Sequence, residues 1–421
     1  MSTIFALITG LGGAVATFRL SGPQTLRIVK DLAGRLPPPR HAGVRRLYAD
    51  GVVLDEALVT TFPAPRSFTG EDVAELSVHG GRAVIASVSQ ALVSLGARPA
   101  EPGEFSRRAF ENGRMDLLQA EAIADLIAAE TEGQRRQALE GRLHESCQLW
   151  RERLLQLLAQ QEALIDFPDE DLPPEVDEAL RQGLQGLRDD MQAALLAAPA
   201  AERLREGLEF VILGPPNAGK STLLNALAEE EVAIVSDLPG TTRDMVGVRV
   251  DLGGVPVRLT DTAGLRETDD KIEAEGVRRA KARAETADFV ILVAGPGEAF
   301  NLPPDGVAAL RVRTKADLRA DEQEFCISAR TGQGMAKLRA RLAEEARLLT
   351  DRQGVPALAR PRQIACVRDT MMALDMALTL EEPELRGEEL RNAAQALARL
   401  VGSIGVEEIL DAVFSGFCIG K

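Results

Sequence analysis

Aromatic residues, cysteines and histidines are all scarce in this chain of 421 residues. Aromatic side chains make up 4% of the sequence against 45% hydrophobic residues, which indicates an ordinary soluble protein with an aliphatic core. Three histidines and four scattered cysteines without a CxxC pair argue against a zinc site or a disulfide framework. We therefore expect a protein of the reducing cytoplasm. The cysteines are Cys147, Cys326, Cys366 and Cys418.

Basic residues are outnumbered by acidic ones, 49 to 64, which gives a formal net charge of −15. Such a charge disfavours indiscriminate binding to nucleic acid or to an anionic membrane. Local basic clusters exist, although clusters of this kind are usually solvated faces. Any contact with RNA is therefore expected to be local or shared with a partner. The clusters comprise Arg107, Arg108 and Arg114, and Arg278, Arg279, Lys281 and Arg283.

Long hydrophobic runs are also missing. The apolar stretch 4–18 contains Ala-Val-Ala at 14–16, like a signal-peptidase site, but no Lys or Arg precedes it and glycines 10, 12 and 13 interrupt it. It is too short to span a bilayer. We predict a strand, a glycine turn and a second strand here, and no association with a membrane.

A phosphate-binding loop is the strongest motif that is present. Residues 214–221 read Gly-Pro-Pro-Asn-Ala-Gly-Lys-Ser, between the apolar run 210–213 and the helix-like run 222–227. A chance glycine-rich turn is the alternative, and the strand and helix flanks argue against it. Backbone N–H groups of such a turn cradle phosphate oxygens, while Lys220 would reach the outer phosphates and the Ser221 hydroxyl would ligate Mg²⁺.

Further GTPase motifs follow in order. Asp261 ends a predicted strand and suits a water-mediated Mg²⁺ contact, and the N–H of Gly264 in Asp-Thr-Ala-Gly suits the γ-phosphate. The polar turn 239–244 is typical of a switch loop, in which Thr242 would complete the Mg²⁺ shell.

The nucleotide base is predicted from two later segments. Thr314-Lys-Ala-Asp317 stands where GTPases carry Asn-Lys-x-Asp, and the Asp317 carboxylate can accept two hydrogen bonds from guanine. Thr314 replaces the usual Asn, so affinity is expected to be weaker. Ser-Ala-Arg at 328–330 resembles the last guanine-binding loop. We expect GTP to be bound by Asn217, Ala218, Gly219, Lys220, Ser221, Thr222, Ser236, Asp237, Leu238, Pro239, Gly240, Thr241, Thr242, Asp261, Thr262, Ala263, Gly264, Thr314, Lys315, Asp317, Ser328, Ala329 and Arg330.

The usual catalytic glutamine is missing. Many small GTPases place Gln directly after Asp-x-x-Gly to orient the attacking water, and Leu265 stands there instead. Glu267 and Glu273 are the nearest glutamates, and from the residues alone either could be a solvated surface charge.

The order of elements predicts the fold class, which is mixed α/β and α. Residues 1–116 alternate short strands and helices, as in an α+β domain. Helical periodicity dominates 117–206 and returns in 349–421, on either side of a Ras-like P-loop GTPase segment at 207–348. A GTPase domain inserted into a helical bundle is the economical interpretation.

Nearly the whole chain resembles the tRNA-modifying GTPase family MnmE (TrmE), which acts on wobble uridines. The specific matches lie outside the common GTPase motifs: Phe-Pro-Ala-Pro-Arg-Ser-Phe-Thr-Gly-Glu-Asp at 62–72, Pro-Gly-Glu-Phe-Ser-Arg-Arg-Ala-Phe at 102–110, Asp-Leu-Leu-Gln-Ala-Glu-Ala at 116–122, and the ending Phe-Cys-Ile-Gly-Lys at 417–421. The glycine turn at 10–13 is one residue shorter than usual in the family and lacks its Arg.

The resemblance implies a tetrahydrofolate derivative (5-formyl- or methylene-tetrahydrofolate) as one-carbon donor. Its binding positions map to Arg19, Glu75, Arg114 and Lys421, where Arg114 replaces the usual Lys. Cys418 is a candidate functional thiol, and a buried apolar cysteine is the equally plausible alternative.

The resemblance also implies a catalytic set and partners. Glu273 aligns with the water-orienting glutamate and would act with Lys220 and Thr242. K⁺ would be held by Asn217, Ser236, Leu238 and Thr241, and Mg²⁺ by Ser221 and Thr242. The implied assembly is a homodimer that joins the flavin-dependent subunit MnmG in a heterotetramer acting on tRNA. The rival interpretation is a ribosome-assembly or signalling GTPase without a role in base modification.

Overall fold

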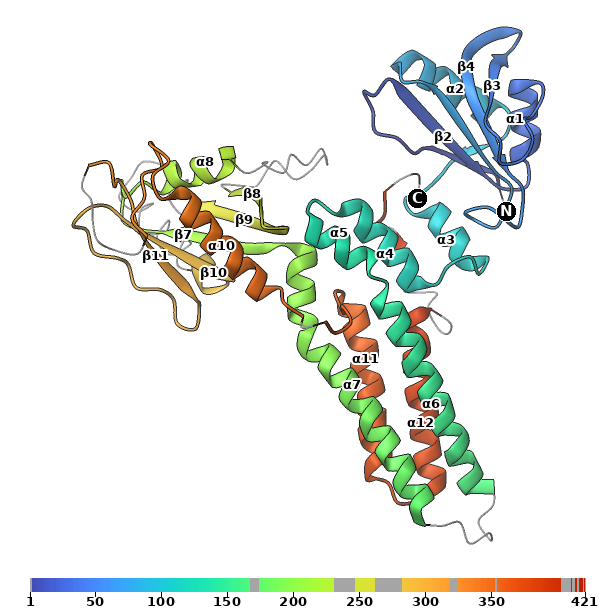
Figure 1. Cartoon of the computed structure of the whole chain (residues 1–421). Helices are drawn as coiled ribbons and strands as arrows, with labels where there is room; N and C mark the ends of the chain where they lie inside the picture. Colours follow the sequence, from blue (N-terminus) through green and yellow to red (C-terminus); the bar gives the residue numbers. More distant parts are fainter. Residues whose placement is uncertain are drawn as a thin grey trace. The chain divides into compact units, whose positions relative to one another are not determined.

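The computed structural model describes residues 2–166, 174–230, 247–261, 282–318, 325–352, 354–402, 410, 413–414, 416–418 and 420. The chain divides into two compact units (Figure 1). The first comprises residues 1–124 with 398–421, and the second comprises residues 125–397.

The first unit contains a six-stranded sheet in the order β3-β4-β5-β2-β1-β6. All neighbouring strands are antiparallel except β1 and β6, which are parallel. Along β2, alternate residues Ala16, Phe18 and Leu20 are buried, whereas Thr17 and Arg19 are only partly covered, so the sheet has one apolar and one polar face. The strands are β1 (Ile4–Leu7), β2 (Val15–Ser21), β3 (Gly43–Ala49), β4 (Val52–Phe62), β5 (Val73–His79) and β6 (Arg98–Pro99).

Helices α1 (Thr25–Ala33) and α2 (Arg82–Ser94) cover the apolar face, where their Ile28, Leu32 and Leu92 join the main core of this unit. On the other face, α3 (Glu104–Glu111) inserts Phe105 against β1.

The C-terminal segment packs against the first turns of α4 (Leu117–Ala128). Phe414 and Phe417 form a buried cluster with Leu117 and Ala120. The rings of Phe414 and Phe417 meet edge to face, with centroids 5.2 Å apart. The end of the chain therefore belongs to the first unit.

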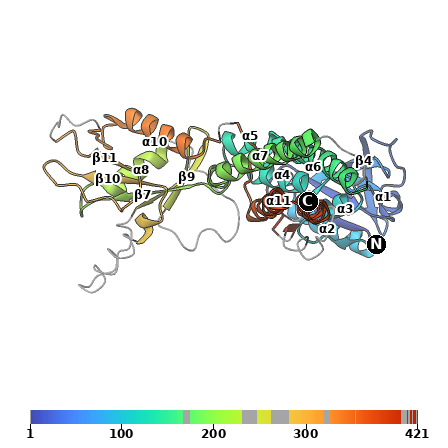
Figure 2. The same cartoon turned by 90° about the horizontal axis from the view of Figure 1, so that it is seen from below.

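The second unit contains a helical bundle. Its longest helix, α7, buries residues spaced alternately by three and four positions, the pattern of a helix with one apolar seam. Helix α7 packs against both α11 and α6; α11 lies beside it in Figure 1, and α6 lies beside it in Figure 2. The buried positions are Leu180, Leu184, Leu187, Met191, Ala194 and Ala198. The bundle helices are α5 (Glu132–Leu139), α6 (Arg142–Asp166), α7 (Pro174–Glu206), α11 (Pro361–Thr379) and α12 (Pro383–Val401).

The same unit contains a five-stranded sheet in the order β11-β10-β7-β9-β8, parallel except for the antiparallel pair β8 and β9. Helices α8 (Lys220–Glu230) and α10 (Met335–Leu349) contribute Leu223, Leu227, Leu338 and Leu342 to the core on one face. The strands are β7 (Leu208–Leu213), β8 (Gly247–Leu252), β9 (Val255–Asp261), β10 (Phe289–Ala294) and β11 (Ala309–Arg313).

The predicted fold class is confirmed. An α+β domain, a helical bundle and a P-loop domain between the two parts of the bundle are all present. Among the described residues, no helix combines the length and the apolar character that crossing a membrane requires.

Candidate functional site

The phosphate-binding loop lies between β7 and α8, at the carboxyl edge of the five-stranded sheet. Asn217 and Gly219 adopt the left-handed conformation, with φ of 60° and 93°. A Cβ on Gly214 would overlap the carbonyl oxygen of Val293 in the neighbouring strand, so this position requires glycine. The loop is therefore built to bring backbone N–H groups close to a ligand.

Lys220 is buried at the first position of α8. Its Nζ donates to the carbonyl oxygens of Gly214 and Pro215, at 3.0 and 2.9 Å, so the side chain folds back over the loop. Burial lowers the pKa of Lys220, and the nearby carboxylates of Asp261 and Glu298 oppose that shift. An anionic phosphate at the loop would give this ammonium a far stronger partner than two carbonyl groups.

Ser221 and Asp261 meet beside the loop. The Ser221 hydroxyl donates to Oδ2 of Asp261 at 2.5 Å, and Asp261 ends β9, the parallel neighbour of β7. A hydroxyl and a carboxylate at this edge are oxygen donors of the kind that Mg²⁺ prefers. The donors present therefore fit the predicted ion.

The base-recognition segment is tied to the phosphate-binding loop. Oγ1 of Thr314, 4% exposed, donates to Ala218 O at 2.5 Å and lies 3.2 Å from Ala294 O. Lys315 adopts a left-handed conformation with φ of 58°.

Asp317 is held by the segment that carries the last predicted guanine motif. The Ser328 hydroxyl donates to Asp317 Oδ1 at 2.7 Å, and the N–H of Ala316 donates to Ile327 O at 3.0 Å. The hydrogen bond from Ser328 lowers the pKa of Asp317, with a further contribution from the backbone. The carboxylate is exposed and ionised, as an acceptor for guanine must be.

The other predicted nucleotide residues are placed as follows. Thr222 lies in the first turn of α8, while Ala329 and Arg330 directly follow Ser328. Several predictions fall outside the described residues, namely Ser236, Asp237, Leu238, Pro239, Gly240, Thr241, Thr242, Thr262, Ala263, Gly264, Glu273 and Lys421.

Two of the predicted folate residues meet on the polar face of the six-stranded sheet. Arg19 of β2 and Glu75 of β5 are register partners, and Nε and Nη2 of Arg19 lie 3.0 and 2.8 Å from Oε1 of Glu75. The Arg19 guanidinium also lies over the Phe68 ring, 5.2 Å from its centroid. A half-covered ion pair beside an aromatic ring could bind a flat, polar ligand with anionic groups.

Arg114 and the end of the chain lie around the same domain. The side-chain stem of Arg114 passes Gly70, where a Cβ would lie 3.2 Å from Cγ of the arginine. A Cβ at Gly420 would lie 2.9 Å from Leu7 O, so Gly420 lies at the end of β1. Cys418 is exposed, so the alternative of a buried apolar cysteine is wrong.

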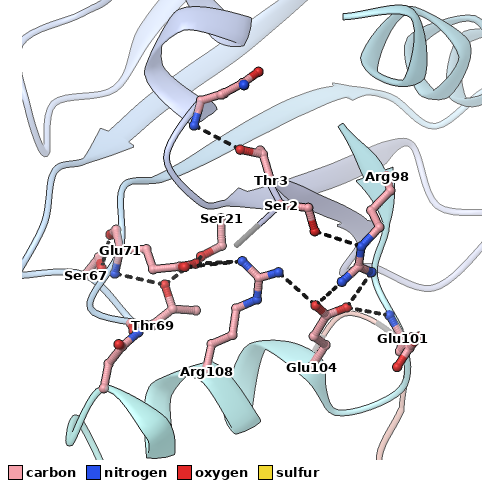
Figure 3. A network of polar contacts seen from close by, with 12 residues as sticks. Ser2, Thr3, Ser21, Ser67, Thr69, Glu71, Arg98, Glu101, Glu104 and Arg108 are labelled. Atoms are coloured by element: carbon pink, nitrogen blue, oxygen red, sulfur yellow. Dashed lines mark hydrogen bonds and ion pairs between the residues drawn. The ribbon is translucent and has the colours of Figure 1, made fainter. Parts of the chain in front are cut away.

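A buried polar network on this domain was not predicted. Arg108 of α3 contacts Glu71, which accepts a hydrogen bond from Ser21, and Glu104 accepts from Arg98 (Figure 3). The sequence motifs at 62–72 and 102–110 contain the acidic residues and Arg108, but no periodicity indicates that the two segments are joined.

Two of the comparisons, with family models and with curated proteins, point to one family. The MnmE helical domain matches residues 117–418, and the N-terminus of the GTP-binding protein TrmE matches residues 3–114. The tRNA modification GTPase MnmE of Acidiphilium cryptum is 58% identical over 99% of this chain and 98% of its own length. The protein of the same name from Gluconacetobacter diazotrophicus is 55% identical over the same shares. The solved G domain of the T. maritima FeoB iron transporter is similar over 33% of this chain and 98% of its own, at 23% identity and a TM-score of 0.24.

Proposed function

This chain belongs to the MnmE (TrmE) family of tRNA modification GTPases, and we propose that it is the GTP-hydrolysing subunit of the enzyme that modifies carbon 5 of the wobble uridine, position 34, of tRNA. The modification would introduce an aminomethyl-type or carboxymethylaminomethyl group. One observation supports this most directly. A single chain carries both the phosphate-binding loop, with Ser221 and Asp261 beside it, and the Arg19–Glu75 ion pair on the domain that matches the TrmE N-terminus. In this proposal residues 1–116 bind folate and dimerise, residues 207–348 hydrolyse GTP, and 117–206 with 349–421 form the helical domain.

Hydrolysis of GTP would rest on residues around the loop. Lys220 turns from its carbonyl partners to the outer phosphates, and Ser221 with Thr242 would hold Mg²⁺, which when bound neutralises phosphate charge. Glu273 would orient the attacking water, since Leu265 cannot. Asn217, exposed in a left-handed conformation, would hold K⁺ together with Ser236, Leu238 and Thr241, and K⁺-stimulated dimerisation of the GTPase domains would follow.

The folate would bind on the N-terminal domain. Arg19, Arg114 and Lys421 are cations for its carboxylates, and Glu75 is an acceptor for N–H groups of the pterin ring. A tetrahydrofolate derivative, 5-formyl- or methylene-tetrahydrofolate, supplies a one-carbon unit when bound. Cys418 is exposed at the end of the same domain and stays a candidate thiol.

The partners follow from charge and family. A chain with a net charge of −15 is poorly suited to hold tRNA alone, so the flavin-dependent subunit MnmG would supply redox chemistry and much of the tRNA contact. The assembly would be a cytoplasmic heterotetramer built on a homodimer of this chain. GTP hydrolysis would drive its conformational cycle.

Mass spectrometry of tRNA nucleosides tests the proposal. Cells lacking this chain should lose the modified wobble uridine. A plasmid copy should restore it, whereas a Lys220→Ala copy should not. An unchanged nucleoside profile, with the protein co-purifying with ribosomal subunits, would favour the rival ribosome-assembly GTPase.

A further inference from the structure

A buried ion pair joins α3 to the loop between β4 and β5. The Arg108 side chain is 5% exposed and that of Glu71 is 13% exposed, and Nη1 of Arg108 lies 3.0 and 3.3 Å from the two carboxylate oxygens (Figure 3). Nη2 of Arg108 donates to Glu104 Oε1 at 2.8 Å. Removing Arg108 would leave the largely buried Glu71 carboxylate without its cation, so the pair constrains the two segments strongly.

The loop from Ser67 to Glu71 is fixed at several further points. The Ser21 hydroxyl lies 2.7 Å from Glu71 Oε2 and 2.6 Å from Thr69 Oγ1. Nδ2 of Asn112, just after α3, donates to Thr69 O at 2.7 Å. The hydrogen bonds reach β2 on one side and α3 on the other, so the path of the loop is set by both.

This loop carries the two groups that touch the predicted folate residues. Phe68 lies under the Arg19 guanidinium and also packs against the small cluster of Ile4 and Phe105. Two residues further on, Gly70 lies against the stem of Arg114 and adopts φ of 80°. A shift of the loop would therefore move the surroundings of both cations at once.

We propose that Arg108 and Glu71 are positioning residues for the folate site, and that their ion pair fixes Phe68 and Gly70 against Arg19 and Arg114. The inference rests on the proposed folate binding. Neither Arg108 nor Glu71 needs to touch the ligand, because their effect passes through the loop. The apolar core under α1 and α2 lies on the opposite face of the sheet and does not include the pair.

Equilibrium binding of 5-formyltetrahydrofolate to the full chain, measured by calorimetry, tests the proposal. Glu71→Gln and Arg108→Met should each weaken binding about tenfold or more. The affinity of Arg108→Lys should lie between that of Arg108→Met and that of the unmodified chain. GTP turnover without folate should stay unchanged, because these residues are not part of the nucleotide site. Glu56→Gln is the matched control, since Glu56 pairs with Arg46 in the same sheet while its side chain is 53% exposed.

A double-mutant cycle with Phe68→Leu separates positioning from general stability. If Glu71 acts through Phe68, the double variant should bind the folate almost as tightly as whichever single variant, Glu71→Gln or Phe68→Leu, binds it less tightly. If the losses of binding free energy of the two single variants add up in the double variant, the proposal is overturned. Should Glu71→Gln fail to fold, Ser21→Ala, which removes the hydroxyl contacts to Glu71 and Thr69 and leaves the ion pair in place, should still weaken binding about threefold. Full affinity in Ser21→Ala would then overturn the proposal. If the unmodified chain does not bind the folate, the proposed function is what fails.

Discussion

The hydroxyl of Thr314 donates a hydrogen bond to the carbonyl oxygen of Ala218 at 2.5 Å, which joins the base-recognition segment directly to the phosphate-binding loop. A Cβ at Gly219 would lie 3.6 Å from the same hydroxyl, so the two segments are in close contact. Thr314 stands where other GTPases carry Asn. The hydroxyl here makes a connection between the two loops that the apolar isostere valine could not.

Replacing Thr314 with valine should weaken binding of GDP and GTP about tenfold. The change leaves the Ala218 carbonyl buried without this donor, which costs about 1–3 kcal/mol. Fluorescence titration with a labelled guanine nucleotide measures the effect. Thr314→Ser keeps the hydroxyl and should bind nearly normally, whereas equal affinity in Thr314→Val would show that the bond does not position the loop.

Replacing Asp317 with asparagine should shift the preference from GTP toward xanthosine triphosphate, because the amide can donate to the second carbonyl of xanthine. The bond from Ser328 lowers the pKa of Asp317 below its usual value of about 4, so its charge, and guanine preference with it, should not change between about pH 5 and 8. Competition between GTP and xanthosine triphosphate across this range measures both effects. An unchanged preference in Asp317→Asn would mean that the base is bound elsewhere.

The sequence was sufficient where local pattern and chemistry coincide. The apolar run before Gly214 is β7, the alternating residues around Phe18 are β2, and the predicted strand that ends at Asp261 is β9. Each is a buried or half-buried strand whose period can be counted from the residues.

Elements whose identity depends on distant partners were not predicted. Strand β3 lies at the edge of its sheet, where the apolar Val44 and Tyr48 are exposed and Arg45 is partly buried, so its polarity does not follow its burial and its pairing with β4 identifies it. Within the predicted helical segment 117–206, α5 ends at Leu139 and α6 begins at Arg142, because Gly141 adopts φ of 61° and interrupts the helix. Likewise the contact between Arg108 and Glu71 joins residues 37 positions apart, which no local period reveals.

Replacing K⁺ with Na⁺ should slow GTP turnover at least about tenfold. The proposed ion supplies positive charge where other GTPases use an arginine finger, and the smaller Na⁺ would not match the same oxygen donors. Steady-state phosphate release at constant ionic strength measures the effect. Asn217→Ala should reduce the difference between the two salts, and equal rates of the unmodified protein in both would contradict the potassium site.

Replacing Glu273 with alanine should abolish hydrolysis and leave GTP binding intact. Leu265 offers no polar group to orient the attacking water, so the proposed role falls on this glutamate. Single-turnover hydrolysis and nucleotide titration together separate the two steps. Glu267→Ala is the control and should hydrolyse GTP normally; a loss of binding in Glu273→Ala would point to a structural role instead.

Replacing Gly103 with alanine should loosen the C-terminal segment. Gly103 begins α3 with φ of 69°, and a Cβ there would overlap the carbonyl oxygen of Phe414. Gly113, beyond the other end of α3, has φ of 64° and open space around its Cβ position, so alanine there introduces backbone strain alone. Backbone strain should lower the free energy of unfolding by about 1–2 kcal/mol in both variants, and the clash should lower it by about 1–3 kcal/mol more in Gly103→Ala.

Hydrogen–deuterium exchange of the peptide that contains Phe414 and Phe417 reads this loosening directly. Exchange should be faster in Gly103→Ala and unchanged in Gly113→Ala, because Phe414 lies against Gly103 and contributes to the cluster on Leu117. Binding of 5-formyltetrahydrofolate should fall with it, since the segment ends at Lys421, one of the proposed folate cations. If exchange speeds up but the folate binds as before, Lys421 takes no part in the folate site, and the C-terminal segment contributes only to the packing of the first unit.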